Sequence, residues 1–228
     1  VPPCFAAKLL GITVYTHECD FSPGLATKIN KNFATKILVS YEETKKFFSQ
    51  AFEKKIQVTG NPVRPVFFNA NSKNGKNFLN IDSLSEKTKN LNILLVIGGS
   101  LGSRQINELV WKNLDFLCKN FIVVHQCGLA DEQTAFKYKS DCNYENYLVY
   151  PFIYEQMADV MASSDVVLSR AGANFLWECA ACGKPMVLIP LSTSGSRGDQ
   201  LENANFFASK GAAVVLSGDK VNNESLIT

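Results

Sequence analysis

The stretch Ile93-Leu94-Leu95-Val96-Ile97-Gly98-Gly99-Ser100-Leu101-Gly102-Ser103 joins an apolar run directly to a glycine-rich turn. Unbroken apolar residues are typical of a strand covered on both faces, as in a parallel sheet. The glycines let the backbone approach a phosphate, and a helix that begins after them offers free N–H groups to an anion. The stretch therefore predicts a strand, a phosphate-binding turn and a helix. A tight strand–helix turn without a ligand is the alternative, because such turns also favour glycine.

Short apolar runs of the same kind recur along the chain and alternate with helical patterns. This alternation predicts right-handed crossovers and a doubly wound α/β sheet. The predicted strands are 12–15, 37–40, 56–59, 93–97, 121–125, 148–150, 166–168, 186–189 and 213–216. The predicted helices are 25–37, 105–117, 154–162, 173–182 and 200–209.

The segment 69–92 interrupts this alternation, because it is rich in Asn, Ser, Lys and Gly and has few apolar positions. Such a composition is typical of a surface insert or linker. Half of a Rossmann-like domain precedes it and a complete one follows. We therefore expect an α/β fold with two facing Rossmann-like domains, 1–65 and 66–228. The chain begins at Val1 and ends in a helix just begun, so we expect the first domain to be incomplete at its N-terminus and the second at its C-terminus.

The composition excludes several classes of protein. The 228 residues are 46% hydrophobic and 19% charged, which is typical of a globular protein. The net charge of +2 is too small to predict a nucleic-acid partner. The seven cysteines are odd in number and irregularly spaced, which indicates reduced thiols and no disulfide framework. Cys179-x-x-Cys182 has the spacing of a redox or metal pair, but no second Cys pair or nearby His completes a zinc site, and two small buried thiols are the favoured interpretation. No metal cluster of carboxylates is visible either, so we expect no metal and no cofactor.

A second glycine-containing turn, Ser169-Arg170-Ala171-Gly172-Ala173-Asn174-Phe175-Leu176-Trp177-Glu178, follows the predicted strand 166–168. A helix that begins near Ala173 places its N-terminus toward a diphosphate. Glu178 then lies in the second turn, where a carboxylate can accept both hydroxyls of a ribose. The alternative is an exposed helix residue, since Glu is a good helix former.

Two further groups of polar residues follow strand ends. Gln200 and Asn203 are one helical turn apart after a long polar loop, so they are positioned to share a hydroxylated ligand. The alternative is that Asp199 or Gly198 simply caps a helix. His17 and Glu18 end the first strand, and they are candidates for a general base and its orienting group. Neighbours on an extended segment point in opposite directions, however, which favours a structural role for this His.

Six motifs taken together resemble the MurG family of glycosyltransferases. In chain order they are His17-Glu18-x-x-x-x-Pro23-Gly24, Gly60-Asn61-Pro62-Val63-Arg64, Gly98-Gly99-Ser100-x-Gly102, Ser169-Arg170-Ala171-Gly172-Ala173, Gly183-x-Pro185 and Asp199-Gln200-x-x-Asn203-Ala204. The resemblance implies a two-domain enzyme of the GT-B type. Such an enzyme moves N-acetylglucosamine from UDP-N-acetylglucosamine to a lipid-linked muramyl-pentapeptide, converting lipid I to lipid II in peptidoglycan synthesis.

The resemblance also implies roles for residues of the donor site. Ser100 and Arg64 correspond to donor-phosphate and hinge-side contacts, Ile153 to the uracil contact, and Glu178 to the ribose ligand. Gln200 corresponds to a sugar contact, and Asp20 to the wall of the cleft beside the acceptor-side candidates His17 and Glu18. The diphosphate-facing helix start corresponds to Ala173, Asn174, Phe175 and Leu176.

The sequence departs from the family at three positions. Cys19 and Asp20 replace Gln and Asn of the cleft wall, and Leu101 replaces Gln in the phosphate loop. The catalytic base of the family lies in an N-terminal segment that this chain lacks, so we expect the catalytic residue to be outside it and the chain alone to bind donor without turnover.

The implied reaction is inverting transfer, and the implied location is peripheral, at the cytoplasmic face of the bacterial inner membrane. Lys28, Lys31 and Lys36 lie along the predicted helix 25–37, where we expect them to contact anionic lipid. An ordinary solvated helix face is the alternative. Three other functions remain open: a diacylglycerol glucosyltransferase, a UDP-N-acetylglucosamine 2-epimerase, and a non-catalytic subunit that binds a UDP-sugar.

Overall fold

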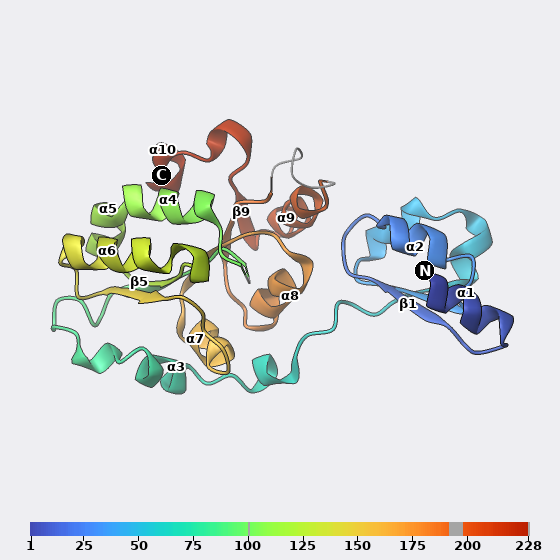
Figure 1. Cartoon of the computed structure of the whole chain (residues 1–228), viewed down its shortest axis with the longest axis horizontal. Coiled ribbons are helices and arrows are strands. Elements are labelled where there is room, and N and C mark those ends of the chain that lie inside the picture. Colours follow the sequence, from blue (N-terminus) through green and yellow to red (C-terminus); the bar gives the residue numbers. More distant parts are fainter. Residues whose placement is uncertain (100, 192–197, 228) are drawn as a thin grey trace.

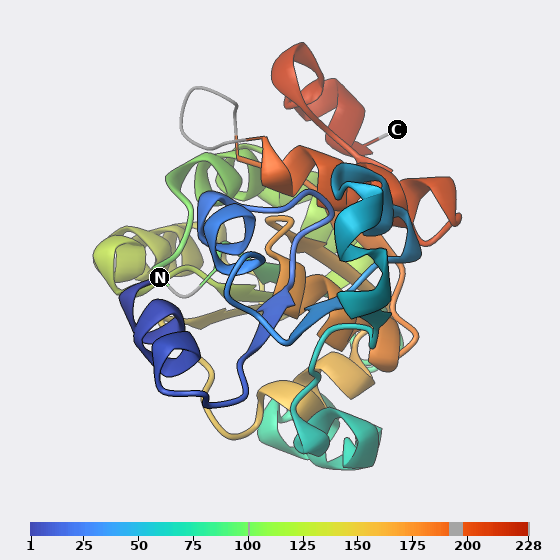
Figure 2. The same cartoon turned by 90° about the vertical axis from the view of Figure 1, so that its right-hand side faces the viewer.

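The computed structural model describes residues 1–99, 101–191 and 198–227. Two parallel sheets lie in separate lobes, which a single segment after β3 (Ile56–Val58) connects (Figure 1). The small lobe carries a three-stranded sheet in the order β1-β2-β3, and the large lobe a six-stranded sheet in the order β6-β5-β4-β7-β8-β9. Figure 2 looks onto the small lobe, with the large lobe behind it.

The small lobe is formed by α1 (Pro2–Leu9), β1 (Tyr15–Glu18), α2 (Leu25–Asn30), β2 (Lys36–Val39) and β3, with 3-10 turns at Glu42–Phe47 and Gln50–Lys55. Its core contains Val14, Ala34, Ile37 and Val39. The predicted strand 12–15 begins too early, because the N–H of Ile12 donates to Ala7 O and closes the end of α1. The predicted helix 25–37 is too long, because Lys36 already pairs with Tyr15 in the sheet.

The large lobe alternates strands and helices. Its strands are β4 (Asn92–Ile97), β5 (Phe121–Gln126), β6 (Tyr147–Tyr150), β7 (Val166–Ser169), β8 (Met186–Leu188) and β9 (Ala213–Val215). Its helices are α3 (Ser72–Phe78), α4 (Arg104–Lys112), α5 (Leu114–Asn120), α6 (Glu132–Cys142), α7 (Met157–Ser163), α8 (Ala173–Ala181), α9 (Asp199–Ser209) and α10 (Asn223–Ile227), with 3-10 turns at Pro65–Asn69, Ile81–Ser83, Leu129–Asp131 and Gly218–Lys220. All neighbouring strands are parallel. The predicted doubly wound α/β fold is confirmed.

The central strand β4 explains the unbroken apolar sequence. Ile93, Leu95 and Ile97 point to a core shared with α7 and α8, whereas Leu94 and Val96 point to a second core shared with α4 and α5. Both faces of the sheet are covered, so neither set of alternating positions can be polar. The order of the strands runs outward in one direction from β4 and in the opposite direction from β7. These two neighbouring strands are parallel, so both end at the same edge of the sheet.

The segment 69–92 is mostly exposed, in keeping with the predicted surface insert or linker, but it packs against the large lobe. It forms α3, which packs on α7 so closely that a Cβ at Gly75 would lie 2.1 Å from the Asp159 carbonyl oxygen. Leu79 and Ile81 are buried in the large-lobe core. Because the Gly75 contact and the two buried apolar side chains hold the segment against the large lobe, its other positions can be polar. The division of the chain at residue 65 stays a prediction.

The lobes meet where α8 and α9 face the small lobe (Figure 1). Tyr41 lies in the large-lobe core cluster with only 1% of its surface exposed. Its ring contacts the Phe206 ring of α9 at 4.6 Å between centroids, and its hydroxyl accepts a hydrogen bond of 3.2 Å from Trp177 Nε1 of α8. Aromatic packing of this kind stabilises one relative placement of the two lobes.

Candidate functional site

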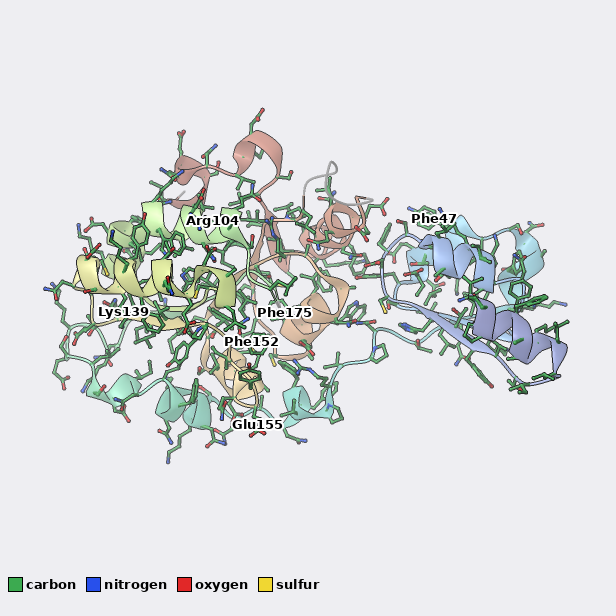
Figure 3. All side chains as sticks on the ribbon, viewed as in Figure 1. Phe47, Arg104, Lys139, Phe152, Glu155 and Phe175 are labelled. Carbon is green, nitrogen blue, oxygen red and sulfur yellow. The ribbon has the colours of Figure 1, made fainter. Side chains whose placement is uncertain are left out.

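A cavity of about 860 Å³ opens at the carboxyl edge of the large sheet, where the strand order reverses. The loops after β4 and β7 wind away to opposite faces there, which leaves a crevice between them. Figure 3 labels Arg104, Phe152 and Phe175, which line the cavity from the start of α4, the loop after β6 and the first turn of α8. The cavity lies where the sequence predicted a phosphate-binding turn.

The glycine-rich loop after β4 forms one wall of the cavity, and its backbone leaves no room for a side chain at Gly98 or Gly102. A Cβ at Gly98 would lie 2.3 Å from the N atom of Ser103. Gly102 has a φ of +82°, and its Cβ would lie 2.4 Å from the carbonyl oxygen of Cys127. Ser103 caps α4, accepting a hydrogen bond from the N–H of Ile106. The predicted phosphate contact Ser100 lies outside the described residues.

The first turn of α8 forms the facing wall. Its N-cap is Gly172, and no side chain of the described residues caps it, so the N–H groups of the first turn are available to an anion. The N–H of Leu176 already donates to the carbonyl of Gly172, and the Leu176 side chain is fully buried. The available donors are therefore those of Ala173, Asn174 and Phe175. The Asn174 side chain accepts a hydrogen bond from Asn61 Nδ2 at 2.8 Å.

Arg170 is a cavity residue that the sequence reasoning did not select. Its Nη1 donates to Gln105 Oε1 at 2.9 Å and to the Ile189 carbonyl at 3.0 Å, whereas its Nε is buried without a partner. Burial lowers the pKa of Arg170, and none of the carboxylates in the described ranges pairs with it. Its position directly after a strand that ends at this edge was the available signal. An anion in the cavity would supply the missing countercharge.

A second arginine of the cavity, Arg104, is already neutralised. Its Nη1 lies 2.5 Å from Asp131 Oδ1, and its Nε lies 2.8 Å from Glu108 Oε1. Two carboxylates therefore compensate the charge that Arg104 places in the first turn of α4. Arg104 contributes less uncompensated positive charge to the cavity than Arg170.

Glu178 is buried, so the alternative of an exposed helix residue is wrong. Only 7% of its surface is exposed. Arg64 Nε donates to Glu178 Oε1 at 2.7 Å, and Arg64 Nη2 donates to Oε2 at 3.2 Å. This hydrogen bonding raises the pKa of Arg64. Arg64 lines the cavity, whereas Glu178 is not among the lining residues, and both of its carboxylate oxygens accept from Arg64.

Ile153 and Gln200 both line the cavity, as the resemblance implies. The N–H of Ile153 donates to Gln126 Oε1 at 2.9 Å, so a uracil would have to displace that amide or use the Ile153 carbonyl. Gln200 lies in the first turn of α9, where its Oε1 accepts a hydrogen bond of 3.1 Å from the N–H of Leu191. Its amide nitrogen is on the same side chain and available as a donor.

The residues of the small lobe lie outside the cavity lining. His17 Nε2 lies 3.1 Å from the carbonyl oxygen of Gly60, and Glu18 accepts hydrogen bonds from the N–H groups of Gly24 and Asp20. The two side chains therefore have separate partners, and Glu18 shapes the loop that follows β1. Asp20 Oδ1 accepts a hydrogen bond of 2.9 Å from Asn203 Nδ2 of the large lobe.

Two facing parallel sheets with a cavity at the switch point of the larger one define a two-lobed α/β protein of the GT-B type. The chain belongs to glycosyltransferase family 28, whose C-terminal domain model matches residues 93–228. The MurG resemblance of the six motifs is confirmed by the relatives that follow.

One curated relative is the UDP-N-acetylglucosamine–N-acetylmuramyl-(pentapeptide) pyrophosphoryl-undecaprenol N-acetylglucosamine transferase of Treponema denticola. It is 52% identical over 97% of this chain and 56% of its own length. The Clostridium perfringens protein of the same name is 38% identical over 100% of this chain and 60% of its own. This chain therefore spans somewhat more than half of the length of these relatives.

Among solved structures, Acinetobacter baumannii MurG matches 99% of this chain and 60% of its own, with a TM-score of 0.73 and 27% identity. A UDP-GlcNAc 2-epimerase of Methanocaldococcus jannaschii matches with a TM-score of 0.61 and 14% identity, which shows the shared fold alone.

Proposed function

We propose that this chain forms the donor-binding part of a transferase that moves N-acetylglucosamine from UDP-N-acetylglucosamine to a lipid-linked muramyl-pentapeptide. The observation that carries the proposal is the cavity between the glycine-rich loop and the uncapped N-terminus of α8, with Arg170 in its wall. A diphosphate has the charge and the acceptor oxygens that this combination lacks. The names of the relatives favour this reaction over the transfer of glucose to diacylglycerol.

The proposed donor site combines residues of both lobes. The N–H groups at the start of α8 bind the diphosphate together with Arg64 and Arg170, and Ile153 contacts the uracil. Glu178 accepts from the ribose once Arg64 gives up its hydrogen bonds to the carboxylate. Gln200 and Asp20 contact the sugar from the two sides of the lobe junction. The full set that we assign to the donor is Asp20, Arg64, Ser100, Ile153, Ala173, Asn174, Phe175, Glu178 and Gln200, with His17 and Glu18 toward the acceptor. Leu176, which the resemblance also implies, is left out because its N–H donates to the Gly172 carbonyl and its side chain is fully buried.

In the proposed reaction the acceptor hydroxyl attacks the anomeric carbon in line, and UDP leaves with inversion. A base takes the proton of the hydroxyl as the new bond forms. The helix dipole and the N–H groups of α8 stabilise the negative charge that develops on the leaving diphosphate. The large lobe therefore accelerates the reaction by stabilising UDP as it leaves.

Calorimetric titration of the chain tests the donor assignment, with UDP, UDP-N-acetylglucosamine and ADP as ligands. We expect both uridine nucleotides to bind at one site and ADP to bind at least about tenfold more weakly, because Ile153 offers backbone groups to a pyrimidine edge. Equal binding of ADP would overturn the uracil assignment. Release of UDP in the presence of a lipid I analogue, measured with the complete protein, tests the transfer step.

We also propose that the protein works as a peripheral protein at an anionic membrane, because the proposed acceptor is anchored in a bilayer. Of the helices in the described ranges, none is long and apolar enough to cross a membrane. The predicted stripe of Lys28, Lys31 and Lys36 along one helix was wrong. Lys36 lies in β2, and Lys31 Nζ lies 4.8 Å from the centroid of the Phe52 ring.

The side chains of Phe5, Leu9, Leu10 and Ile12 are exposed on and after α1, which offers an apolar contact instead. Sedimentation with vesicles tests the proposal. Because the apolar contact adds to the weak attraction between anionic lipid and a chain of net charge +2, we expect binding to anionic vesicles that weakens with salt. Equal binding to neutral vesicles at low salt would contradict it.

A further inference from the structure

Asn203 of α9 is fully buried at the junction of the two lobes, and its side-chain amide uses both of its ends there. Its Oδ1 accepts a hydrogen bond of 2.8 Å from the N–H of Phe21. Its Nδ2 donates to Asp20 Oδ1 at 2.9 Å and, more weakly, to the Ala171 carbonyl at 3.5 Å. One side chain therefore joins the loop after β1 to the turn that opens α8.

The two ends of this amide are not interchangeable. The backbone N–H of Phe21 requires an acceptor, and the carboxylate of Asp20 requires a donor, so only one orientation of the Asn203 side chain satisfies both. An aspartate at this position would still accept from Phe21, but its other oxygen would face the Asp20 carboxylate. Like charges in a buried contact repel strongly unless one of them takes up a proton.

The contact lies beside the proposed sugar end of the donor site. Asn203 is one helical turn beyond Gln200, which lines the cavity, and Ala171 precedes Gly172 at the start of α8. The residues that line the cavity around the proposed diphosphate and uracil positions belong to the large lobe and to Arg64 of the connecting segment. The small lobe therefore reaches the proposed donor site from the side of Asp20.

We propose that Asn203 is a positioning residue that holds Asp20 against the large lobe and thereby sets the affinity for the sugar of the donor. The inference rests on the proposed function, because it assigns the region between Asp20 and Gln200 to the sugar. It adds one specific claim. The Asn203 amide keeps the two lobes in contact, and this contact raises the affinity for the sugar of UDP-N-acetylglucosamine but not the affinity for UDP.

The test measures the effect of Asn203→Asp in two backgrounds, the parent chain and Asp20→Asn, at pH 8. In the parent background we expect Asn203→Asp to weaken UDP-N-acetylglucosamine binding ~tenfold and UDP binding far less. In the Asp20→Asn background the amide at position 20 can donate to the new carboxylate, so we expect the same substitution to weaken binding by less than about twofold.

Asn205→Asp is the matched control, since Asn205 lies on the exposed face of the same helix and undergoes the same chemical change. We expect it to leave both affinities unchanged. An equal loss for UDP and UDP-N-acetylglucosamine, or an equal penalty in both backgrounds, would overturn the inference.

If the parent binds neither nucleotide, the proposed function and the sugar coupling both fail. The lobe contact is then judged from melting temperatures, where Asn203→Asp must lower the value and Asp20→Asn must restore most of it.

Discussion

Arg64, in the segment that connects the lobes, binds Glu178 of α8 through two hydrogen bonds, from Nε to Oε1 at 2.7 Å and from Nη2 to Oε2 at 3.2 Å. The carboxylate side chain is 9% exposed and the arginine side chain 61% exposed. The pair therefore connects a buried acceptor to a largely hydrated donor. Of the two, only Arg64 lines the cavity.

The first prediction concerns the stability that this pair supplies. We expect Glu178→Ala to lower the free energy of unfolding by about 1–2 kcal/mol, because it removes a buried carboxylate together with its bonds. The coupling energy of a double-mutant cycle with Arg64→Ala should be only about 0.5–1 kcal/mol, since water solvates most of Arg64. Urea unfolding of the four proteins measures both values, and additive effects of the two substitutions would show that the pair contributes nothing.

The second prediction concerns pH. Burial lowers the pKa of His125 from 6.5 to about 3, although the charge of Asp131 opposes the shift. Below pH 6.5, His125 is therefore protonated in the unfolded chain, whereas in the folded chain it stays neutral down to about pH 3. Stability is highest above pH 6.5 and falls below it, by up to about 1.4 kcal/mol per pH unit from this residue.

His125→Gln should reduce that slope between pH 6.5 and 5 in urea unfolding, because Gln can still hydrogen bond to Tyr147 and Asn107 but does not titrate. An unchanged slope would contradict the assignment. If the variant does not fold, NMR titration of the parent decides: a His125 ring that takes up a proton near pH 6 would refute the prediction.

The third prediction compares two glycines of the cavity walls that differ in the space available for a side chain but not in backbone strain. Gly98 and Gly172 both have φ values outside the left-handed region, but a Cβ at Gly98 meets backbone at 2.3 Å whereas one at Gly172 meets nothing within 4 Å. Gly98→Ala should therefore destabilise the protein by about 1–3 kcal/mol, and Gly172→Ala should have little effect on stability. Thermal unfolding of the two variants measures the difference, and similar melting temperatures would refute the predicted clash.

The sequence predicted the large-lobe sheet well, because its strands are apolar on both faces and remain recognisable without their neighbours. It failed where tertiary contacts decide the structure. The break between α4 and α5 occurs at Asn113, whose Nδ2 donates to the Leu109 carbonyl, and no apolar pattern records such a bond. Helix α6 buries only Ala135 and so had no periodic pattern to detect.

The site was predictable in outline for a similar reason. The resemblance assigned both glycine-containing turns to the phosphates of the donor, and Gly98 and Gly172 do line one cavity, because the strand ends that precede them meet at the switch point. The pairing of Glu178 was not predictable, because its partner Arg64 is 114 residues away in the sequence. Arg170 was overlooked because its unpartnered Nε becomes visible only when the surrounding atoms are placed.

The most direct test of the central claim, that the cavity beside α8 holds a uridine diphosphate, is calorimetric titration of the chain with UDP before and after Glu178→Ala. A carboxylate that accepts two ribose hydroxyls contributes charge-assisted hydrogen bonds, so we predict at least a tenfold loss, about 1.4 kcal/mol. Glu178→Gln should fall between the two, and Glu202→Ala, at an exposed position of α9, should bind like the parent. If the folded Glu178→Ala variant binds UDP as tightly as the parent, the proposed donor site is wrong.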